Sequence, residues 1–358
     1  MTKILLYSDN HFCSYSSIVR GRGTKYSIRL ENQLQTMKWL LKTAYDNDCV
    51  GAFCLGDFFD RADLNAEEVK ALSEIDFGTT MPHYFIVGNH EISRADCAYS
   101  TAHAFLQNSN CTVYDKPGII GFGDTLVYIL PYMLDKKENV NDYFPDLPEL
   151  KNKKKILLMH NDIKGIQMGQ FVSKEGLDLD TLSKSFSLVV NGHLHNSSWV
   201  ANNVFNIGNI TGQNFSEDGF TYEHHAMIID LDTFEYNIIR NPWAFNFYKI
   251  DWSHGTDIDV INRTSERMVN YVATIKVAPQ SAEYVKYRFD PALPEHQYIP
   301  RNANGVACKV IVEYPTEKIQ QQDVSSLHFD HIQEFQKFIT AVMPNNELVI
   351  SELQEVLS

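Results

Sequence analysis

The sequence predicts an α/β fold whose sheet is covered by helices on both faces. Six apolar segments rich in β-branched or aromatic residues are predicted as strands, at residues 3–9, 50–57, 83–89, 125–132, 155–161 and 186–193. Between the first two, apolar residues recur at helical spacing: Leu30, Leu34, Met37, Leu41 and Ala44. Residues 66–72 predict a second helix. Near-continuous apolar strands that alternate with helices are typical of a sheet buried on both faces.

The chain is long enough for more than one domain. Its 358 residues exceed a single core at about 150 residues per domain. The residue pattern changes near residue 249. Beyond it, two strand-like segments are separated by Pro291, Pro294 and Pro300, and no polar catalytic pattern occurs. We therefore expect three parts: residues 1–248, a small α+β unit at residues 249–318, and a linker followed by helices at residues 319–358.

The last of these parts carries an amphipathic stripe. Apolar residues recur there at helical spacing: Phe329, Ile332, Phe335, Ile339 and Val342. Such a stripe suits docking to a partner protein. Packing against the body of the chain itself is an equal alternative.

Composition narrows the cellular setting. No apolar run approaches the roughly 20 residues that span a bilayer, and the first residues show no signal-peptide pattern. The six cysteines form no C-x-x-C pair, which favours reduced thiols and a cytoplasmic location. The net charge of −14 argues against non-specific nucleic-acid binding through phosphate neutralisation. Any claim of DNA binding must therefore account for the negative sign of the net charge.

Polar residues follow five of the predicted strands at the point where each strand ends. These strand exits read Asp9-Asn10-His11, Gly56-Asp57-Phe58-Phe59-Asp60, Gly88-Asn89-His90-Glu91, His160, and Gly192-His193-Leu194-His195. In open α/β sheets, ligands collect outside the carboxyl ends of the strands. A two-residue spacing on an extended segment also points both side chains the same way, as a shared metal requires.

Each motif alone has an ordinary explanation. Asp9 and His11 could simply begin a loop, the Gly-Asp pair at 56 and 57 could form a turn, and His160 could be structural. Their conjunction at five strand exits instead predicts a metal centre. The ligand candidates are Asp9, His11, Asp57, Asn89, His160, His193 and His195.

The mixture of donors indicates the kind of metal and substrate. Imidazole, carboxylate and amide ligands suit Mn²⁺, Fe²⁺ or Zn²⁺ better than Ca²⁺ or Mg²⁺, which favour shells of oxygen alone. Two carboxylates around two divalent ions leave a net positive charge. We therefore expect an anionic substrate, for which phosphate is the obvious choice.

The order of these motifs resembles that of the calcineurin-like metallophosphoesterase superfamily across residues 3–245. Within it, the chain is most similar to the SbcD-type DNA repair nucleases, and among those to the phage-encoded nuclease subunits. "YDKP" at 114–117, "LPYM" at 130–133 and "NIGN" at 206–209 support the resemblance. It implies a two-sheet sandwich flanked by helices, with a capping unit that binds DNA and a C-terminal segment that docks on an ATPase.

The resemblance also implies the division of the ligands between two ions. One ion is held by Asp9, His11 and His195. The other is held by Asn89, His160 and His193, with Asp57 bridging the two. The metal expected for this family is Mn²⁺, with Mg²⁺, Fe²⁺ and Zn²⁺ as alternatives.

Three further residues take catalytic roles by the same resemblance. His90 matches the histidine that protonates the leaving oxygen, and Glu91 would hold its imidazole in orientation. Asp60 stands where some relatives carry a histidine, so we expect it to orient a metal-bound histidine or a loop. Two cations about 3.5–4 Å apart would clamp the phosphodiester, lower the pKa of a bridging water and stabilise the developing charge.

The implied activity is phosphodiester hydrolysis on DNA, as a 3'–5' exonuclease with endonuclease activity in end processing, recombination and repair. A phosphoprotein phosphatase is the alternative, with Arg61 binding a monoester phosphate. Those phosphatases lack the paired GHxH motif, which favours the nuclease. A third reading makes the chain chiefly a binding subunit whose activity depends on a partner.

The resemblance implies partners as well as substrate. An SMC-like, SbcC-type ATPase would supply much of the DNA affinity that an acidic nuclease lacks, in a heterotetramer containing a homodimer of this chain. If the chain is phage-encoded, the location is the host cytoplasm. Candidate DNA contacts are Arg20, Arg22, Lys25, Arg29 and Arg61, with a solvated surface turn as the alternative for the loop that carries the first four.

Overall fold

The computed structural model describes residues 2–19, 21–78, 81–94, 96–145, 153–168, 171–289 and 308–314. The chain divides into two compact units, Met1–Glu313 and Tyr314–Ser358, and every helix and strand below lies in the first. Arg20 and the predicted docking stripe lie outside the described residues. The stripe comprises Phe329, Ile332, Phe335, Ile339 and Val342. The predicted division at residues 248 and 318 stays a prediction.

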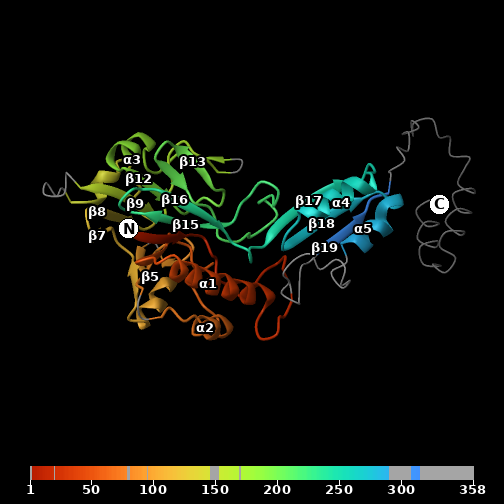
Figure 1. The fold of residues 1–358 in the computed structure, drawn as a ribbon, viewed down its shortest axis with the longest axis horizontal. Coiled ribbons are helices and arrows are strands. Elements are labelled where there is room, and N and C mark those ends of the chain that lie inside the picture. The colour runs from red at the N-terminus through yellow and green to blue at the C-terminus, as the bar shows by residue number, and fades with distance from the viewer. Residues whose placement is uncertain are drawn as a thin grey trace, which may run out of the picture. The chain divides into compact units, whose positions relative to one another are not determined.

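Two six-stranded sheets form the body of the first unit (Figure 1). The first sheet has the order β16 (Tyr236–Arg240), β15 (His225–Asp230), β1 (Lys3–Tyr7), β2 (Gly51–Cys54), β3 (His83–Ile86) and β6 (Cys111–Tyr114). Its strands β1, β2, β3 and β6 run parallel, while β15 and β16 are antiparallel to their neighbours.

The second sheet has a parallel centre with antiparallel edges. Its order is β13 (Ser198–Ala201), β14 (Val204–Asn206), β12 (Leu188–Asn191), β9 (Lys154–Met159), β8 (Thr125–Leu130) and β7 (Gly118–Phe122). Strands β14, β12, β9 and β8 are parallel. All six strands expected from apolar segments are confirmed, three in each sheet.

Side-chain alternation along the strands builds the layers. In β1, Ile4 and Leu6 pack between the two sheets against residues such as Val127 and Leu158. Leu5 of the same strand faces the other way, into the cluster that contains Leu30, Met37 and Leu40 of α1 (Ile28–Asp46). Since side chains of a strand alternate between faces, each sheet needs cover on both sides.

Helices supply that cover. Figure 1 shows α1 and α3 (Leu179–Ser185) on opposite sides of the paired sheets, and Leu182 of α3 packs on the outer face of the second sheet. The predicted second helix is α2 (Ala66–Leu72), which begins with a capping box between Asn65 and Glu68. The structure therefore confirms the two-sheet sandwich flanked by helices.

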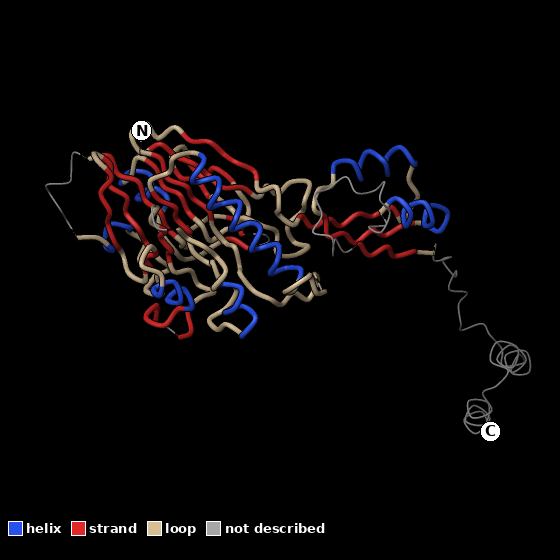
Figure 2. Tube along the Cα trace, turned by 60° about the horizontal axis from the view of Figure 1, so that its bottom comes forward, coloured by secondary structure: helices blue, strands red, loops and turns tan. Residues whose placement is uncertain are grey.

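A third, three-stranded sheet follows the sandwich (Figure 2). It consists of β17 (Asn246–Trp252), β18 (Tyr271–Val277) and β19 (Cys308–Val312), all parallel, with α4 (Ile258–Arg267) and α5 (Ala282–Arg288) between them in the chain. Ile261, Ile275 and Val285 are fully buried in its own apolar cluster. The region expected to be a small α+β unit thus has parallel strands that alternate with helices.

The remaining elements are short. They are β4 (Ile92–Arg94), β5 (Asp96–Ser100), η1 (Thr101–Gln107), η2 (Val140–Tyr143), β10 (Gln167–Met168), β11 (Phe171–Val172) and η4 (Pro279–Ser281). Among the described residues, no helix has the length and apolar character needed to cross a bilayer.

Two histidines belong to this framework. His83 on β3 is 2% exposed, and its Nε2 lies 3.0 Å from the carbonyl oxygen of Phe77. His225 on β15 is also buried. Burial disfavours the charged imidazole, and it lowers the pKa of each histidine to about 4. Both therefore stay neutral in the folded protein at pH 7.

Acid should destabilise the fold through these two residues. Below pH 6.5 an unfolded histidine binds a proton, whereas the folded one stays neutral until about pH 4. The free energy of unfolding therefore falls as the pH drops from 7 to 4. The loss reaches about 3 kcal/mol per histidine near pH 4 and is absent above pH 7. His83→Gln keeps a donor for Phe77 and removes the titration. In urea denaturation of metal-free protein, its stability should fall less over this range; equal losses would contradict the assignment.

Candidate metal centre

The carboxyl ends of five strands bring the predicted ligands together. Strands β1, β2 and β3 are parallel neighbours in one sheet, and β9 and β12 are parallel neighbours in the other. Among the described residues, three groups of side chains have ligand atoms within 4.8 Å of one another, and two of them consist of predicted ligands: Asp9, His11 and His195, and Asp57, His160 and His193. Asn89 adjoins the second group, so all seven candidates lie in these two clusters. The third group is His11, Asp60 and His90.

Four of the ligands sit on left-handed backbone. The φ angles are 51° at Asp9, 46° at His11, 47° at Asp57 and 36° at His193. Such conformations are uncommon for non-glycine residues and cost about 1–3 kcal/mol each. The expectation that Asp9 and His11 face one site because their segment is extended is therefore wrong. A strained turn brings them together.

Backbone hydrogen bonds and glycines hold the turns in place. The Asp9 amide donates to the Gly56 carbonyl at 3.1 Å, and the His11 amide donates to the Asp57 carbonyl at 3.0 Å. Gly56 has a φ of 104°, and a Cβ there would overlap the His160 ring. A Cβ on Gly192 would overlap the Leu55 carbonyl oxygen. Glycine is required at both positions by close approach of the two sheets' loops.

Helix α1 supports the first turn from behind. Gln33 donates from Nε2 to the carbonyl oxygens of Asn10 and His11, at 2.8 and 2.6 Å, and its Oε1 accepts from the Cys13 amide at 3.1 Å. Gln33 is 1% exposed. It was not anticipated from the sequence, where it is one polar residue among several on the helix.

The first cluster contains a carboxylate that lacks a partner. Asp9 is fully buried, and neither of its oxygens has a hydrogen-bond partner. The Nε2 atoms of His11 and His195 lie 3.9 and 3.8 Å from Asp9 Oδ1 and 3.2 Å from each other. An uncompensated buried carboxylate costs on the order of several kcal/mol. Two imidazole nitrogens and a carboxylate that face one another fit a divalent cation.

The second cluster is centred on His160. Its Nε2 lies 3.1 Å from Asp57 Oδ2, 3.2 Å from Asn89 Oδ1 and 3.3 Å from His193 Nδ1. Its other ring nitrogen, Nδ1, lies 2.7 Å from the Leu55 carbonyl oxygen. Since a carbonyl only accepts, Nδ1 carries a proton, and Nε2 is the ring atom that could bind a metal in place of a second proton.

Asp57 and His160 perturb each other's pKa in opposite directions. Burial alone would raise the pKa of Asp57, but the neighbouring His160 lowers it below its usual range. Burial would lower the pKa of His160, but Asp57 raises it to about 9. The Asp57 carboxylate therefore stays ionised at neutral pH, in a cleft between imidazoles that favours a cation.

Two outer carboxylates were missed by the sequence reasoning. Glu217 Oε1 lies 2.7 Å from Nδ1 of His195, and Asp162 Oδ1 lies 3.0 Å from Nε2 of His193. Asp162 is two residues beyond His160, and Glu217 falls in the acidic loop after "NIGN". Both positions were visible in the sequence, but the folded contacts alone connect them to the ligands.

The three predicted catalytic residues separate into different environments. His90 is exposed; its backbone amide donates to Asp57 Oδ1 at 2.9 Å, and its ring Nδ1 lies 3.0 Å from the Asp60 carbonyl oxygen. The Asp60 carboxylate lies 3.3 Å from His11 Nδ1, so it is within reach of a candidate ligand, and its orienting role stays a prediction. These contacts place His90 at the opening of the centre, next to both clusters.

Glu91 differs from the expectation that it holds the His90 ring. It is fully buried, and its two oxygens accept from the amides of Gly88 and Phe59 at 2.9 and 3.0 Å. Burial, reinforced by the charge on Asp57, raises the pKa of Glu91 to about 8. Glu91 therefore braces the backbone of two neighbouring loops, and the Asp60 carbonyl oxygen takes the place expected for it beside His90.

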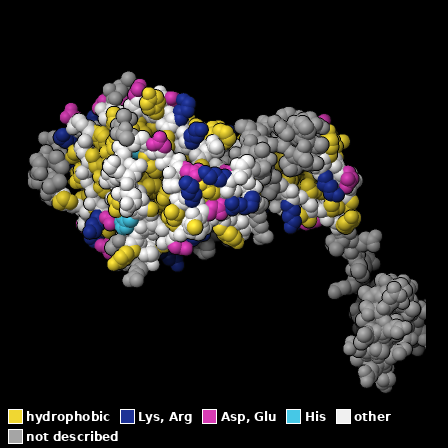
Figure 3. All heavy atoms as spheres, turned by 90° about the horizontal axis from the view of Figure 1, so that it is seen from below, with side chains coloured by type: hydrophobic (Ala, Val, Ile, Leu, Met, Phe, Trp, Pro, Cys, Tyr) yellow, Lys and Arg dark blue, Asp and Glu magenta, His cyan; other side chains and the backbone are white. Residues whose placement is uncertain are grey.

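Most of the predicted DNA contacts already pair with other side chains of the protein. Arg29 is 4% exposed and contacts Cys13 Sγ and Gln213, so its predicted role as a DNA contact is wrong: its guanidinium is buried. Arg22 pairs with Glu67 at 2.6 Å, and Lys25 pairs with Glu74. On the face in Figure 3, Lys and Arg side chains lie among Asp and Glu side chains. The loop therefore offers little uncompensated positive charge.

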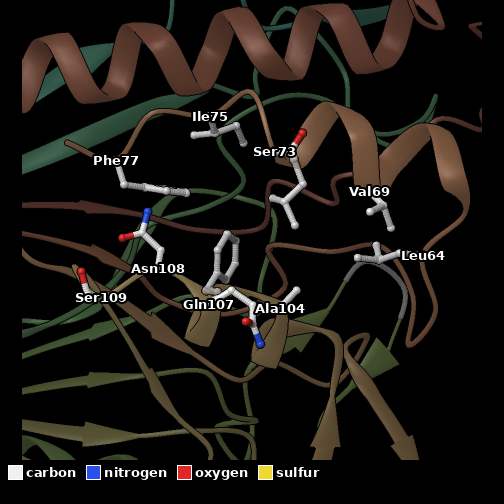
Figure 4. Close-up of a pocket in the computed structure, with 11 residues that line it drawn as sticks. Leu64, Val69, Ser73, Ile75, Phe77, Ala104, Gln107, Asn108 and Ser109 are labelled. Atoms are coloured by element: carbon white, nitrogen blue, oxygen red, sulfur yellow. The ribbon is translucent and has the colours of Figure 1, made fainter. Parts of the chain in front are cut away.

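A separate cavity of about 590 Å³ lies between α2 and η1 (Figure 4). Leu64, Val69, Ile75 and Phe77 give it an apolar lining, with Ser73 at its rim. None of the residues that line it is a metal-ligand candidate. The lining of this cavity therefore offers none of the candidate metal ligands of the centre.

Two known proteins have sequences similar to part of this chain. Exonuclease subunit 1 of Enterobacteria phage T4 is 26% identical over 178 residues, which cover 48% of this chain and 50% of that protein. Putative phosphoesterase 244L of Invertebrate iridescent virus 6 is 29% identical over 154 residues, which cover 41% of this chain and 52% of that protein. The chain thus spans about half the length of the curated relatives it matches.

Solved structures show a distant likeness. A novel archaeal phosphodiesterase is 14% identical with a TM-score of 0.36, and a dimetal phosphatase from Danio rerio is 10% identical with a TM-score of 0.40. Each match covers 67% of this chain and 99% of the other.

The family model for calcineurin-like phosphoesterases matches residues 2–197, more than half of the chain. Members of this family use a dinuclear divalent metal site, and the two clusters supply the donors for one. The chain belongs to the calcineurin-like phosphoesterase family and is a metal-dependent hydrolase.

Proposed function

We propose that this hydrolase is a DNA nuclease that cleaves phosphodiesters with two divalent ions, as a 3'–5' exonuclease with endonuclease activity in DNA end processing, recombination and repair. The observation that carries the proposal is the pair of adjoining ligand clusters with the exposed His90 beside them. The similarity to Exonuclease subunit 1 of phage T4 supports DNA as the substrate.

In this proposal the residues divide into two ligand sets. Asp9, His11 and His195 would hold one ion, Asn89, His160 and His193 would hold the other, and Asp57 would contribute to both. The buried, unpartnered oxygens of Asp9 support this division. We propose Mn²⁺ as the metal, with Mg²⁺, Fe²⁺ and Zn²⁺ as alternatives, because the donors mix imidazole with oxygen. When bound, two such ions supply positive charge that stabilises a developing phosphoryl anion and acidifies water.

His90 is the proposed general acid. The carbonyl of Asp60 accepts from Nδ1, which leaves Nε2 as the ring atom that can deliver a proton to a leaving sugar oxygen. The bond from the His90 amide to Asp57 Oδ1 ties this ring to a metal ligand. Its exposure allows contact with a substrate, whereas Asp9, Asp57 and His160 are buried.

A phosphomonoesterase is less well supported. It would need Arg61 free to bind a terminal phosphate. Arg61 Nη2 instead lies 2.9 Å from both carboxylate oxygens of the buried Glu68, so its charge is already compensated. A role as a binding subunit alone is also less well supported, because the ligand set is complete.

We also propose that the chain works in a complex. The T4 relative is named as a subunit, and the compensated charge of Arg22 and Lys25 leaves DNA affinity to another chain. An SMC-like ATPase in a heterotetramer, docked through the stripe from Phe329 to Val342, would supply it. The proposed location is the cytoplasm, in a host cell if the chain is phage-encoded.

The substrate class can be tested directly. With Mn²⁺, the protein should degrade end-labelled duplex or single-stranded DNA, with products that shorten from the 3' end, and leave a phosphorylated protein unchanged. EDTA should abolish cleavage. Release of phosphate from the phosphoprotein without DNA cleavage would overturn the nuclease in favour of the monoesterase.

His90→Asn should lower hydrolysis of bis-p-nitrophenyl phosphate by about 10²–10⁴-fold, because it removes the proposed proton donor. The variant should bind as much Mn²⁺ as the wild type, measured by elemental analysis. His103→Asn is a matched control, since His103 pairs with Asp115 away from the ligands. Loss of metal from His90→Asn would show that His90 acts through the metals instead.

Asp57→Ala should lose both ions, because the proposed bridge contributes to each. Elemental analysis after desalting should find fewer than about 0.2 Mn²⁺ per chain, which corresponds to a large loss of affinity on removal of a shared anionic ligand. Asp180→Ala, which removes an exposed carboxylate paired with Lys184, should retain two. Two tightly bound ions in Asp57→Ala would rule out the bridging role.

A further inference from the structure

The contact between Asp162 and His193 belongs to a small network in which Asp162 is buried and Lys136 reaches the surface. Asp162 Oδ1 lies 3.0 Å from His193 Nε2, and its Oδ2 lies 2.5 Å from Lys136 Nζ. The Asp162 side chain is only 10% exposed. The Leu177 amide donates to its backbone carbonyl at 2.9 Å, so the residue is fixed through both main chain and side chain.

This network determines which nitrogen of His193 can bind a metal. An ionised carboxylate only accepts hydrogen bonds, so Nε2 of His193 must carry the proton. The lone pair is then on Nδ1, which lies 3.3 Å from His160 Nε2 in the second cluster. Without Asp162, the ring could carry its proton on either nitrogen and rotate about its side-chain torsions.

His195 has a parallel but different arrangement. Glu217 Oε1 fixes the proton on Nδ1 of His195 at 2.7 Å, which leaves Nε2 facing Asp9. The other oxygen of Glu217 accepts from neutral groups, Asn209 Nδ2 at 3.0 Å and the Gln213 amide at 2.8 Å. Among the residues that the structure describes, no Lys or Arg pairs with Glu217 as Lys136 pairs with Asp162. The two histidines of one motif therefore present opposite ring nitrogens.

Cation binding in the second cluster depends more on its neutral donors than cation binding in the first. Besides the shared Asp57, its donors are Asn89, His160 and His193, which are all neutral when they bind a cation. The first cluster has its own carboxylate, Asp9. Coulomb attraction to a divalent ion is therefore weaker in the second cluster, and correct presentation of each neutral donor matters more.

We propose that Asp162, anchored by Lys136, is a positioning residue that presents Nδ1 of His193 to the second cation site and thereby sets its occupancy, while Glu217 does the same for His195 and the first site. The proposal rests on the ligand assignment above. Its readout is metal content, which does not depend on whether the substrate is DNA.

Mn²⁺ titration of EDTA-treated full-length protein by calorimetry tests this. Wild type should bind two ions, and Asp162→Ala should weaken one site about 10–100-fold, as loss of an outer partner does, with the other changed by less than about threefold. At two equivalents of Mn²⁺, the spin-coupled pair signal of the wild type should give way to the six-line signal of isolated Mn²⁺. Asp162→Asn, which keeps an acceptor oxygen, should fall between the two.

The reciprocal variant separates positioning from general damage. Glu217→Ala should weaken a single site too, and the double variant should lose both, whereas Asp180→Ala should bind like wild type. Far-UV circular dichroism and thermal melts show whether each variant is folded. Wild-type stoichiometry below two would overturn the ligand assignment and this inference with it. Two unchanged sites in folded Asp162→Ala, or equal loss at both sites, would overturn the positioning role alone.

Discussion

The buried carboxylate of Asp9 is the interaction on which the centre depends. It is fully buried with no hydrogen-bond partner for either oxygen, and the nitrogens nearest to it belong to two histidines that are themselves candidate ligands. A folded protein tolerates such a group only if something else compensates its charge, since desolvation costs on the order of several kcal/mol. A divalent cation would supply that compensation, and its binding free energy would add to the stability of the fold.

Strain in the backbone points in the same direction. Left-handed backbone conformations, which residues other than glycine rarely adopt, occur at Asp9, His11, Asp57 and His193. The sheets make this possible, because amides of the first exit donate to carbonyls of the second, and Gly56 and Gly192 let the loops approach without a side chain between them. The backbone at the strand exits is therefore held rigidly, and these exits determine the geometry of the candidate ligands.

The sequence predicted the strands and the seven ligands because both are local patterns: an apolar run followed directly by a donor residue. It could not predict contacts that join distant segments. Asp162 and Glu217 are ordinary acidic residues until the fold sets each beside a ring nitrogen. Arg29 looked like a surface cation for the same reason, since only packing of α1 on the first turn buries it. The left-handed turn at Asp9 could not be predicted either, because no glycine marks it in the sequence.

The proposed function requires an acidic chain to act on a polyanion. The net charge of −14 repels DNA at long range, and Glu67 and Glu74 neutralise Arg22 and Lys25 in the loop expected to attract it. The remaining local attraction comes from the cation site itself, where seven ligands contribute only two formal negative charges, from Asp9 and Asp57. Within a Debye length of about 8 Å, a phosphate would be attracted mainly by bound ions. Beyond that distance, the proposed nuclease would depend on its proposed partner for DNA affinity, so hydrolysis at the centre and affinity for the polymer would be separable.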